Sequence, residues 1–152
     1  GVKKTYTITV ARETSSGGAS LTSSEYKIGS TITGVDLKTS VSSFKSKIKV
    51  PSGYTMKVLN SSGKEVTSGN IGTGMRAVLY KNGSAQKSHT VVIKGDVNGD
   101  GACSSVDALM AERYILTGAF FSGSDINGDG KVSTVDVLYM ERHIIGTYEI
   151  KN

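Results

Sequence analysis

Two acidic strings of twelve residues carry the chemistry of this chain. DVNGDGACSSVD begins at Asp96, and DINGDGKVSTVD begins at Asp125, 29 positions later. In each string, oxygen-bearing side chains recur at positions 1, 3, 5, 9 and 12, and glycine occupies position 6. Ca²⁺ takes about six to eight oxygen ligands, and a twelve-residue loop with this spacing and a sharp glycine turn can wrap it. The strings therefore predict two calcium loops.

The expected ligands of the two Ca²⁺ ions follow from these positions. Each loop presents three carboxylates, which would repel one another without a cation. Mg²⁺ is less favoured, because it tolerates only a tight octahedron. A single such string also occurs in Asp- and Gly-rich turns that bind nothing, but two copies in register favour calcium. The ligands are Asp96, Asn98, Asp100, the Ala102 carbonyl, Ser104 and Asp107 in the first loop, and Asp125, Asn127, Asp129, the Lys131 carbonyl, Ser133 and Asp136 in the second.

The strings belong to a longer internal duplication. Residues 96–118 align on residues 125–147 with 12 identities in 23 positions, and an apolar-periodic helix is expected after each loop. No helix is expected before the first loop, because SHTVVIKG is strand-like, so the unit is loop–helix. Position 12 is Asp where an ordinary EF-hand has Glu. Position 8 is Cys103 in the first copy, which we interpret as a small buried hydrophobe, with a reactive thiol as the alternative.

This combination of duplicated loops, Asp at position 12 and one helix after each loop resembles the dockerin modules of cellulosome-type systems. The resemblance covers residues 95–147. It implies an all-α module with two EF-hand-like calcium loop–helix repeats, which is not catalytic and docks into a cohesin of a scaffoldin or cell-surface protein. It also implies that the partner contacts loop positions 10 and 11 and the outer face of each helix. On this chain the partner-binding residues would be Ser105, Val106, Met110, Arg113, Thr117, Thr134, Val135, Tyr139 and Arg142.

Helical geometry also divides the apolar residues of the two helices between faces. At about 100° per residue, Val106, Met110 and Arg113 project in similar directions, and Tyr139 falls on the corresponding face of the second helix. The same geometry predicts a different, core-facing side for four large residues, Leu109, Leu116, Leu138 and Ile145. For Met110 and Tyr139, packing between domains is the alternative to partner binding.

The charge distribution divides the chain in two. Residues 1–94 carry 14 Lys or Arg against 4 Asp or Glu, whereas residues 95–152 carry 4 against 9. The lysines are spread singly without an arginine cluster, so a solvated basic surface is favoured over nucleic-acid binding. No apolar run approaches the ~20 residues of a membrane helix, and no signal peptide opens the chain. No nucleophile–base pair, carboxylate dyad or phosphate loop points to an enzyme, and the GTG at residues 72–74 is too short for the last of these.

The basic part of the chain has the pattern of a small β-rich module. We expect three segments: a strand and linker at residues 1–24, which is similar to the last strand of cadherin-like β-sandwich modules; a β-rich module at 25–94; and the dockerin-like module at 95–152. Val41, Phe44 and Ile48 predict one short helix, with Thr39 or Ser40 as its N-cap. The strings TSVSSFKSKI, GTGM and TVVIKGDVNGDG resemble the X modules found before some dockerins. The expected fold of this module is immunoglobulin-like or β-grasp-like.

The leading interpretation is a secreted, calcium-dependent interaction module that anchors its parent protein in an extracellular complex, with the β-rich module as a spacer or stabiliser. We expect it to be monomeric when free. A calcium-stabilised structural stalk without a cohesin partner is the alternative. A carbohydrate-binding β-module is disfavoured, because the chain has no Trp to stack on sugar rings.

Overall fold

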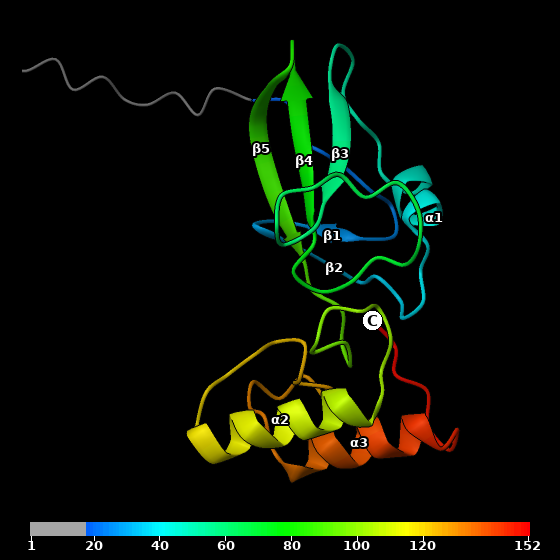
Figure 1. Ribbon diagram of the computed structural model, residues 1–152, viewed down its shortest axis with the longest axis vertical. Coiled ribbons are helices and arrows are strands. Elements are labelled where there is room, and N and C mark those ends of the chain that lie inside the picture. The colour runs from blue at the N-terminus through cyan, green and yellow to red at the C-terminus, as the bar shows by residue number, and fades with distance from the viewer. Residues whose placement is uncertain (1–17) are drawn as a thin grey trace, which may run out of the picture.

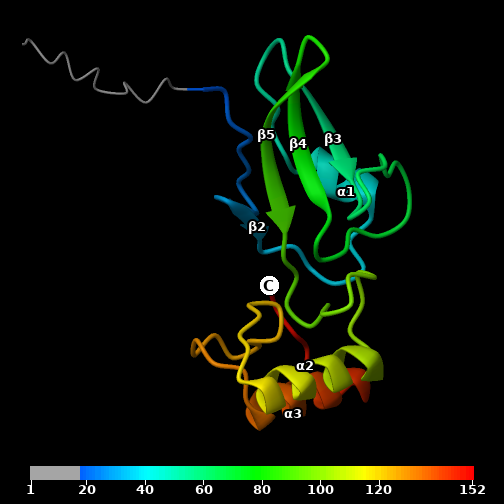
Figure 2. The ribbon, with the colours of Figure 1, turned by 60° about the vertical axis from the view of Figure 1, so that its left-hand side comes forward.

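A computed structural model describes residues 18–152 of the chain. A β-rich part and a pair of helices lie at opposite ends of the long axis, and the last residues return from the helices toward the junction (Figure 1). A view turned by 60° shows the same separation (Figure 2). The strand predicted within residues 4–12 lies outside the described residues.

The β-rich part contains one five-stranded mixed sheet, with the strand order β1-β2-β5-β4-β3. β2 pairs with β5 in parallel, and the other pairs are antiparallel. An immunoglobulin-like sandwich needs two stacked sheets, and residues 18–152 form a single one. The strands are β1 (Lys27–Ile28), β2 (Thr31–Thr33), β3 (Thr55–Leu59), β4 (Arg76–Lys81) and β5 (Ser84–Val91).

The short helix α1 (Val41–Ser46) confirms the helix predicted from the apolar spacing. Ser40 is the N-cap, and its side chain accepts a hydrogen bond from the Ser43 N–H at 3.1 Å. Phe44 is fully buried and stacks on Tyr26, with 5.4 Å between the ring centroids. α1 therefore closes the core of the β-rich part, together with the buried faces of the strands.

The C-terminal part is built on two helices that pack side by side, α2 (Ser105–Thr117) and α3 (Thr134–Ile144). As predicted, the element directly before the first acidic string is a strand and not a helix, because β5 ends at Val91 and the string begins at Asp96. The buried faces of α2 and α3 include Ala108, Ala111, Val137 and Met140. These residues form a second core with Val97, Ile126 and Ile150.

The prediction that four large apolar residues face this core is wrong. Leu109, Leu116, Leu138 and Ile145 are between 50 and 85 % exposed. The small side chains of Ala108 and Ala111 occupy the contact face of α2, and the larger leucines therefore turn outward. Which side of a helix meets its neighbour depends on the packing partner, and residue size alone does not settle it.

Direct hydrogen bonds join the two parts. The Lys38 N–H donates to the Gly101 carbonyl at 2.7 Å, and the Thr73 N–H donates to Asp96 Oδ2 at 2.7 Å. At the other side of the junction, the Lys94 N–H donates to Oδ1 of Asn152 at 2.6 Å. Leu37 packs against both cores. The charge boundary near residue 94 thus lies at a packed junction.

Candidate calcium loops and docking surface

The last aspartate of each acidic string locks its loop onto the helix that follows. We name residues 96–107 loop 1 and residues 125–136 loop 2. In loop 1, Asp107 Oδ1 accepts the N–H groups of Val97 and Asn98 at 2.8 and 3.0 Å. Asp107 Oδ2 accepts the N–H and the hydroxyl of Ser104 at 2.9 and 2.7 Å. The carboxylate thus ties the beginning of the loop to the first turn of α2.

Loop 2 repeats this arrangement. Asp136 Oδ1 accepts the N–H groups of Ile126 and Asn127, and Oδ2 accepts the N–H and the hydroxyl of Ser133. Both Asp107 and Asp136 are fully buried. The donors satisfy the hydrogen-bonding capacity of each buried carboxylate. In both copies, position 12 therefore has a clear structural role, and its role as a metal ligand stays a prediction.

The polar residues at positions 3 and 5 form a second repeated feature. The Asn98 side-chain amide donates to Asp100 Oδ2 at 3.0 Å, and its Oδ1 accepts the Asp100 N–H at 2.8 Å. Asn127 and Asp129 make the same two bonds in loop 2. All four side chains are exposed at the loop surface. The two loops therefore present matched oxygen-rich rims to solvent.

The first aspartate of each loop is where the copies differ. Asp96 Oδ1 accepts the Gly99 N–H within loop 1, but its Oδ2 accepts the Thr73 N–H from the β-rich part. The hydrogen bonds to Asp125 all come from loop 2 itself, from the N–H groups of Gly128, Asp129 and Gly130. Burial raises the pKa of Asp96 above its ordinary value, and the N–H donors of Thr73, Gly99 and Gly101 oppose that shift.

The donor set fits calcium by its chemistry, because carboxylate, amide, hydroxyl and backbone oxygens are the ligands of a hard cation. The buried aspartates also lack a cationic partner. Within residues 18–152, the ion pairs join Lys47 to Glu25 and Lys57 to Glu65, and neither pair involves a loop residue. However, no three Asp, Glu, His or Cys side chains of the described residues converge on one point as a metal cluster would. The individual ligand assignments and the count of two ions stay predictions.

Cys103, at position 8 of loop 1, packs as a partly buried residue against the C-terminal core. Burial raises the pKa of its thiol to about 12, with a further contribution from the nearby Asp107, Asp96 and Asp100 carboxylates. The thiol is therefore protonated at neutral pH, which favours the structural interpretation over a reactive one.

The predicted partner-binding residues divide into an exposed and a partly buried set. Met110 and Tyr139 are partly buried and pack against the C-terminal core, and Tyr139 stacks on Tyr148 at 4.7 Å between centroids. They contribute to packing within the helical part, not between the two parts. The exposed set is Ser105, Val106, Arg113, Thr117, Thr134, Val135 and Arg142.

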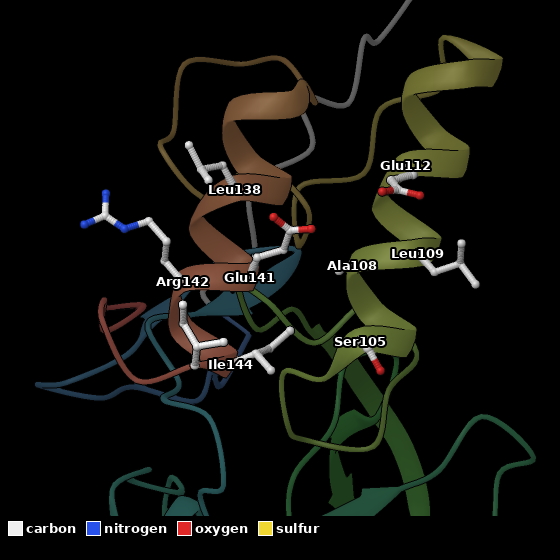
Figure 3. A pocket seen from close by; sticks show the side chains of 9 residues that line it. Ser105, Ala108, Leu109, Glu112, Leu138, Glu141, Arg142 and Ile144 are labelled. Carbon is white, nitrogen blue, oxygen red and sulfur yellow. The ribbon is translucent and has the colours of Figure 1, made fainter.

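An open groove of about 570 Å³ runs between α2 and α3. Leu109 lines it from α2, and Leu138, Ile144 and Ile145 line it from α3 or just after. Glu112 and Glu141 face the gap from opposite helices, while the Arg142 guanidinium extends outward from α3 (Figure 3). The groove is therefore lined by exposed apolar side chains with charged ones around it. The helix pair that carries it lies at the end of the molecule away from the sheet (Figure 1).

Sequence reasoning missed two groups of residues around these sites. The exposed leucines were assigned to the core, although their number on a short helical pair is itself a signal of an interaction surface. The Gly72–Thr73 segment was considered only as a phosphate loop, and its contact with loop 1 links residues 23 positions apart. The duplicated string gives no sign that, among the described residues, only loop 1 receives backbone hydrogen bonds from the β-rich part, whereas loop 2 meets it through the Lys94 side chain.

The comparison with protein families identifies the helical part. Residues 94–145 match the family described as the Dockerin type I domain, about a third of the chain. This match and the duplicated loop–helix geometry show that the chain carries a dockerin module. Domains of this family bind calcium, dock to cohesins and are not catalytic themselves. Neither a curated protein nor a solved structure matches the chain. No helix within the described residues is long and apolar enough to cross a membrane.

Proposed function

We propose that this chain, which carries a dockerin module at residues 94–145, attaches its parent protein to a cohesin of a scaffoldin or cell-surface anchor. The observation that carries the proposal is the exposed apolar face of α2 and α3. Nine large apolar side chains are exposed in the described residues, and seven of them lie on or directly beside these helices. Soluble proteins rarely leave such a concentration open unless a partner covers it.

The docking surface combines this apolar face with the ends of the loops. Val106 and Val135 stand at the equivalent second positions of α2 and α3, and both are about half exposed. Arg113 and Arg142 follow seven residues later in each copy, two turns further along the helix. Apolar residues at the centre with arginines at the margin are typical of protein–protein interfaces. Leu109 and Leu138 extend the surface into the groove.

Calcium binding is the proposed condition for docking. A bound cation would neutralise most of the negative charge in each loop and hold the loop closed. The side chains proposed to hold it are those at positions 1, 3, 5, 9 and 12, with the backbone carbonyls of Ala102 and Lys131. Asp107 and Asp136 fix the loop onto its helix, so the loop oxygens and the docking residues move as one unit. Residues 95–152 are the proposed extent of the module.

The duplication provides two similar docking faces. Val106 with Arg113 and Val135 with Arg142 are equivalent pairs in the two copies. We therefore propose that either copy can face the cohesin, in two orientations about 180° apart. The Met110/Tyr139 and Thr117/Gly146 differences between the two faces oppose full equivalence.

The parent protein is proposed to be secreted and to reside in an extracellular or cell-surface complex, with the chain monomeric when free. Residues 25–94 are proposed to act as a spacer that holds the docking face away from the preceding part of the protein. Its single sheet and α1 lie at the opposite end from the apolar face (Figure 1).

A pull-down with a panel of recombinant cohesin modules, in calcium and in excess chelator, tests the proposal. Capture by at least one cohesin in calcium alone is expected. With that cohesin, Val106→Asp plus Arg113→Asp should retain binding through the second copy, as should Val135→Asp plus Arg142→Asp. The four substitutions together should abolish it. Loss of binding in the variant with only Val106→Asp and Arg113→Asp would contradict the two-orientation mode. Failure of every cohesin to capture the chain would favour the structural-stalk alternative.

A further inference from the structure

The two loops differ in the backbone hydrogen bonds that cross from the β-rich part into loop 1. The Thr73 N–H donates to Asp96 Oδ2 at 2.7 Å, whereas the hydrogen bonds to the equivalent Asp125 come from within loop 2. The Lys38 N–H also donates to the Gly101 carbonyl at 2.7 Å. The first and sixth positions of loop 1 are thus both held by the sheet-bearing part.

The segment that makes this contact is itself anchored. The Ile93 N–H donates to Thr73 Oγ1 at 3.0 Å, which fixes the Thr73 backbone beside the start of loop 1. The Ile71 N–H donates to the Thr39 carbonyl at 2.8 Å, in the strand-like stretch before α1. The donor aimed at Asp96 is therefore positioned by the core of the β-rich part and not by loop 1.

The glycines at the junction show how close the two backbones come. A Cβ on Gly72 would lie 2.0 Å from the Gly99 carbonyl oxygen, and a Cβ on Gly101 would lie 2.4 Å from the Ile71 carbonyl oxygen. A Cβ on Gly99 would lie 2.6 Å from the Thr73 carbonyl oxygen. In loop 2, Gly130 has no atom within 4 Å of such a Cβ, and Gly128 has only the Lys94 amine at 3.6 Å. Loop 1 is packed backbone against backbone, whereas loop 2 meets the β-rich part through a side chain, with Lys94 Nζ donating to the Ile126 carbonyl at 3.2 Å.

We propose that the Gly72–Thr73 segment is a positioning element for loop 1, so that calcium binding at loop 1 is thermodynamically coupled to the β-rich part through backbone contacts that loop 2 lacks. This inference rests on the proposed calcium function of the loops. A donor that orients a ligand carboxylate raises metal affinity, and its loss typically lowers that affinity by about 10–100-fold. Because linkage is reciprocal, calcium in loop 1 must stabilise the junction by the same factor.

The test is a calcium titration of the full chain followed by NMR, with the Gly101 amide reporting loop 1 and the Gly130 amide reporting loop 2. Gly72→Ala forces the segment off loop 1. We expect it to raise the Kd of loop 1 on the order of tenfold or more, with loop 2 within about twofold of wild type. Gly29→Ala is the matched control, because this glycine of the same module has its nearest atom at 3.8 Å. It should change neither Kd.

A second pair of variants keeps the test decisive if Gly72→Ala fails to fold. Gly99→Ala and Gly128→Ala are equivalent positions with φ of +88° and +75°, so both carry the left-handed strain of a non-glycine residue. Only Gly99→Ala also collides with Thr73, and it should weaken its own loop at least about tenfold more than Gly128→Ala weakens loop 2. The inference would be wrong, while the calcium function stood, if the two variants of each pair had equal effects. That outcome is an equal loop 1 Kd in Gly72→Ala and Gly29→Ala, and equal weakening of the altered loop in Gly99→Ala and Gly128→Ala. If neither reporter amide responded to calcium in the wild type, the calcium function and this inference would both fall.

Hydrogen exchange gives the reciprocal readout. Calcium should slow exchange of the Ile71 amide in the wild type and in Gly29→Ala, but not in Gly72→Ala. Equal slowing in all three proteins would contradict the coupling.

Discussion

At the scale of single residues, the aspartates at positions 5 and 12 of the two loops differ in burial and hydrogen bonding. Asp107 and Asp136 are fully buried, and each accepts four hydrogen bonds from its own loop and helix start. The carboxylates of Asp100 and Asp129 are exposed and accept hydrogen bonds only from residues two positions away. The sequence pattern predicts a carboxylate at positions 5 and 12 of each loop, but it cannot tell which of the two is buried and which is exposed.

Asp136→Ala should therefore destabilise the helical part strongly. The change leaves buried N–H groups of Ile126 and Ser133 without an acceptor, at a cost of about 2–4 kcal/mol in the free energy of unfolding. Urea denaturation at saturating calcium, followed by circular dichroism, measures this cost. Val135→Ala at the neighbouring exposed position is the control, and an equal loss of stability in the two variants would contradict the role of Asp136.

At the scale of elements, α1 and the helix pair show what periodicity can and cannot predict. The spacing of Val41, Phe44 and Ile48 predicted α1 and its Ser40 cap, because a one-sided helix buries its apolar residues against a single neighbour. The same reasoning failed for Leu109 and Leu138. There the contact between helices uses Ala108 and Ala111, and the apolar surplus is left for a partner, so residue size no longer marks the core.

The corrected packing makes a direct prediction about α3. Met140 is fully buried, so Met140→Ala should cost about 2–5 kcal/mol in the free energy of unfolding. Leu138→Ala, two residues earlier but half exposed, should stay within about 0.5 kcal/mol. Chemical denaturation of both variants in calcium compares them. A larger cost for Leu138→Ala than for Met140→Ala would restore the original core assignment.

Leu138→Ala should have its effect on docking instead. Together with Leu109→Ala, it removes apolar area from the proposed docking surface while the fold is retained, and binding to a captured cohesin should weaken by at least about tenfold. Surface plasmon resonance in calcium measures the change. Lys49→Ala, an exposed position in the β-rich part, is the control. Unchanged affinity in the double variant would place the docking surface elsewhere.

At the scale of the whole molecule, a basic β-rich part and an acidic helical part meet through backbone contacts at loop 1. The charge boundary and the duplicated strings predict two modules that meet near residue 94. The inequality of the loops was not predictable, because it arises from Gly72 and Thr73, which lie outside the repeat. Chain order says nothing about which of two equivalent loops packs on a preceding module.

Calcium removal should act on the whole chain. Each loop concentrates three carboxylates, and buried Asp96 and Asp125 lack a cationic partner among the described residues. At free calcium about a thousandfold above Kd, each occupied site would contribute about 4 kcal/mol of stability. Scanning calorimetry should therefore show a lower melting temperature in excess chelator. An unchanged melt would contradict the calcium assignment.

The central claim is that calcium-loaded loops present the apolar face of α2 and α3 to a cohesin. Isothermal titration of the full chain with a cohesin from the panel, in calcium and again in excess EDTA, tests it most directly. We predict saturable one-to-one binding in calcium and no detectable binding in EDTA. Binding of equal affinity in both conditions, or no binding to any cohesin of the panel in calcium, would contradict the account.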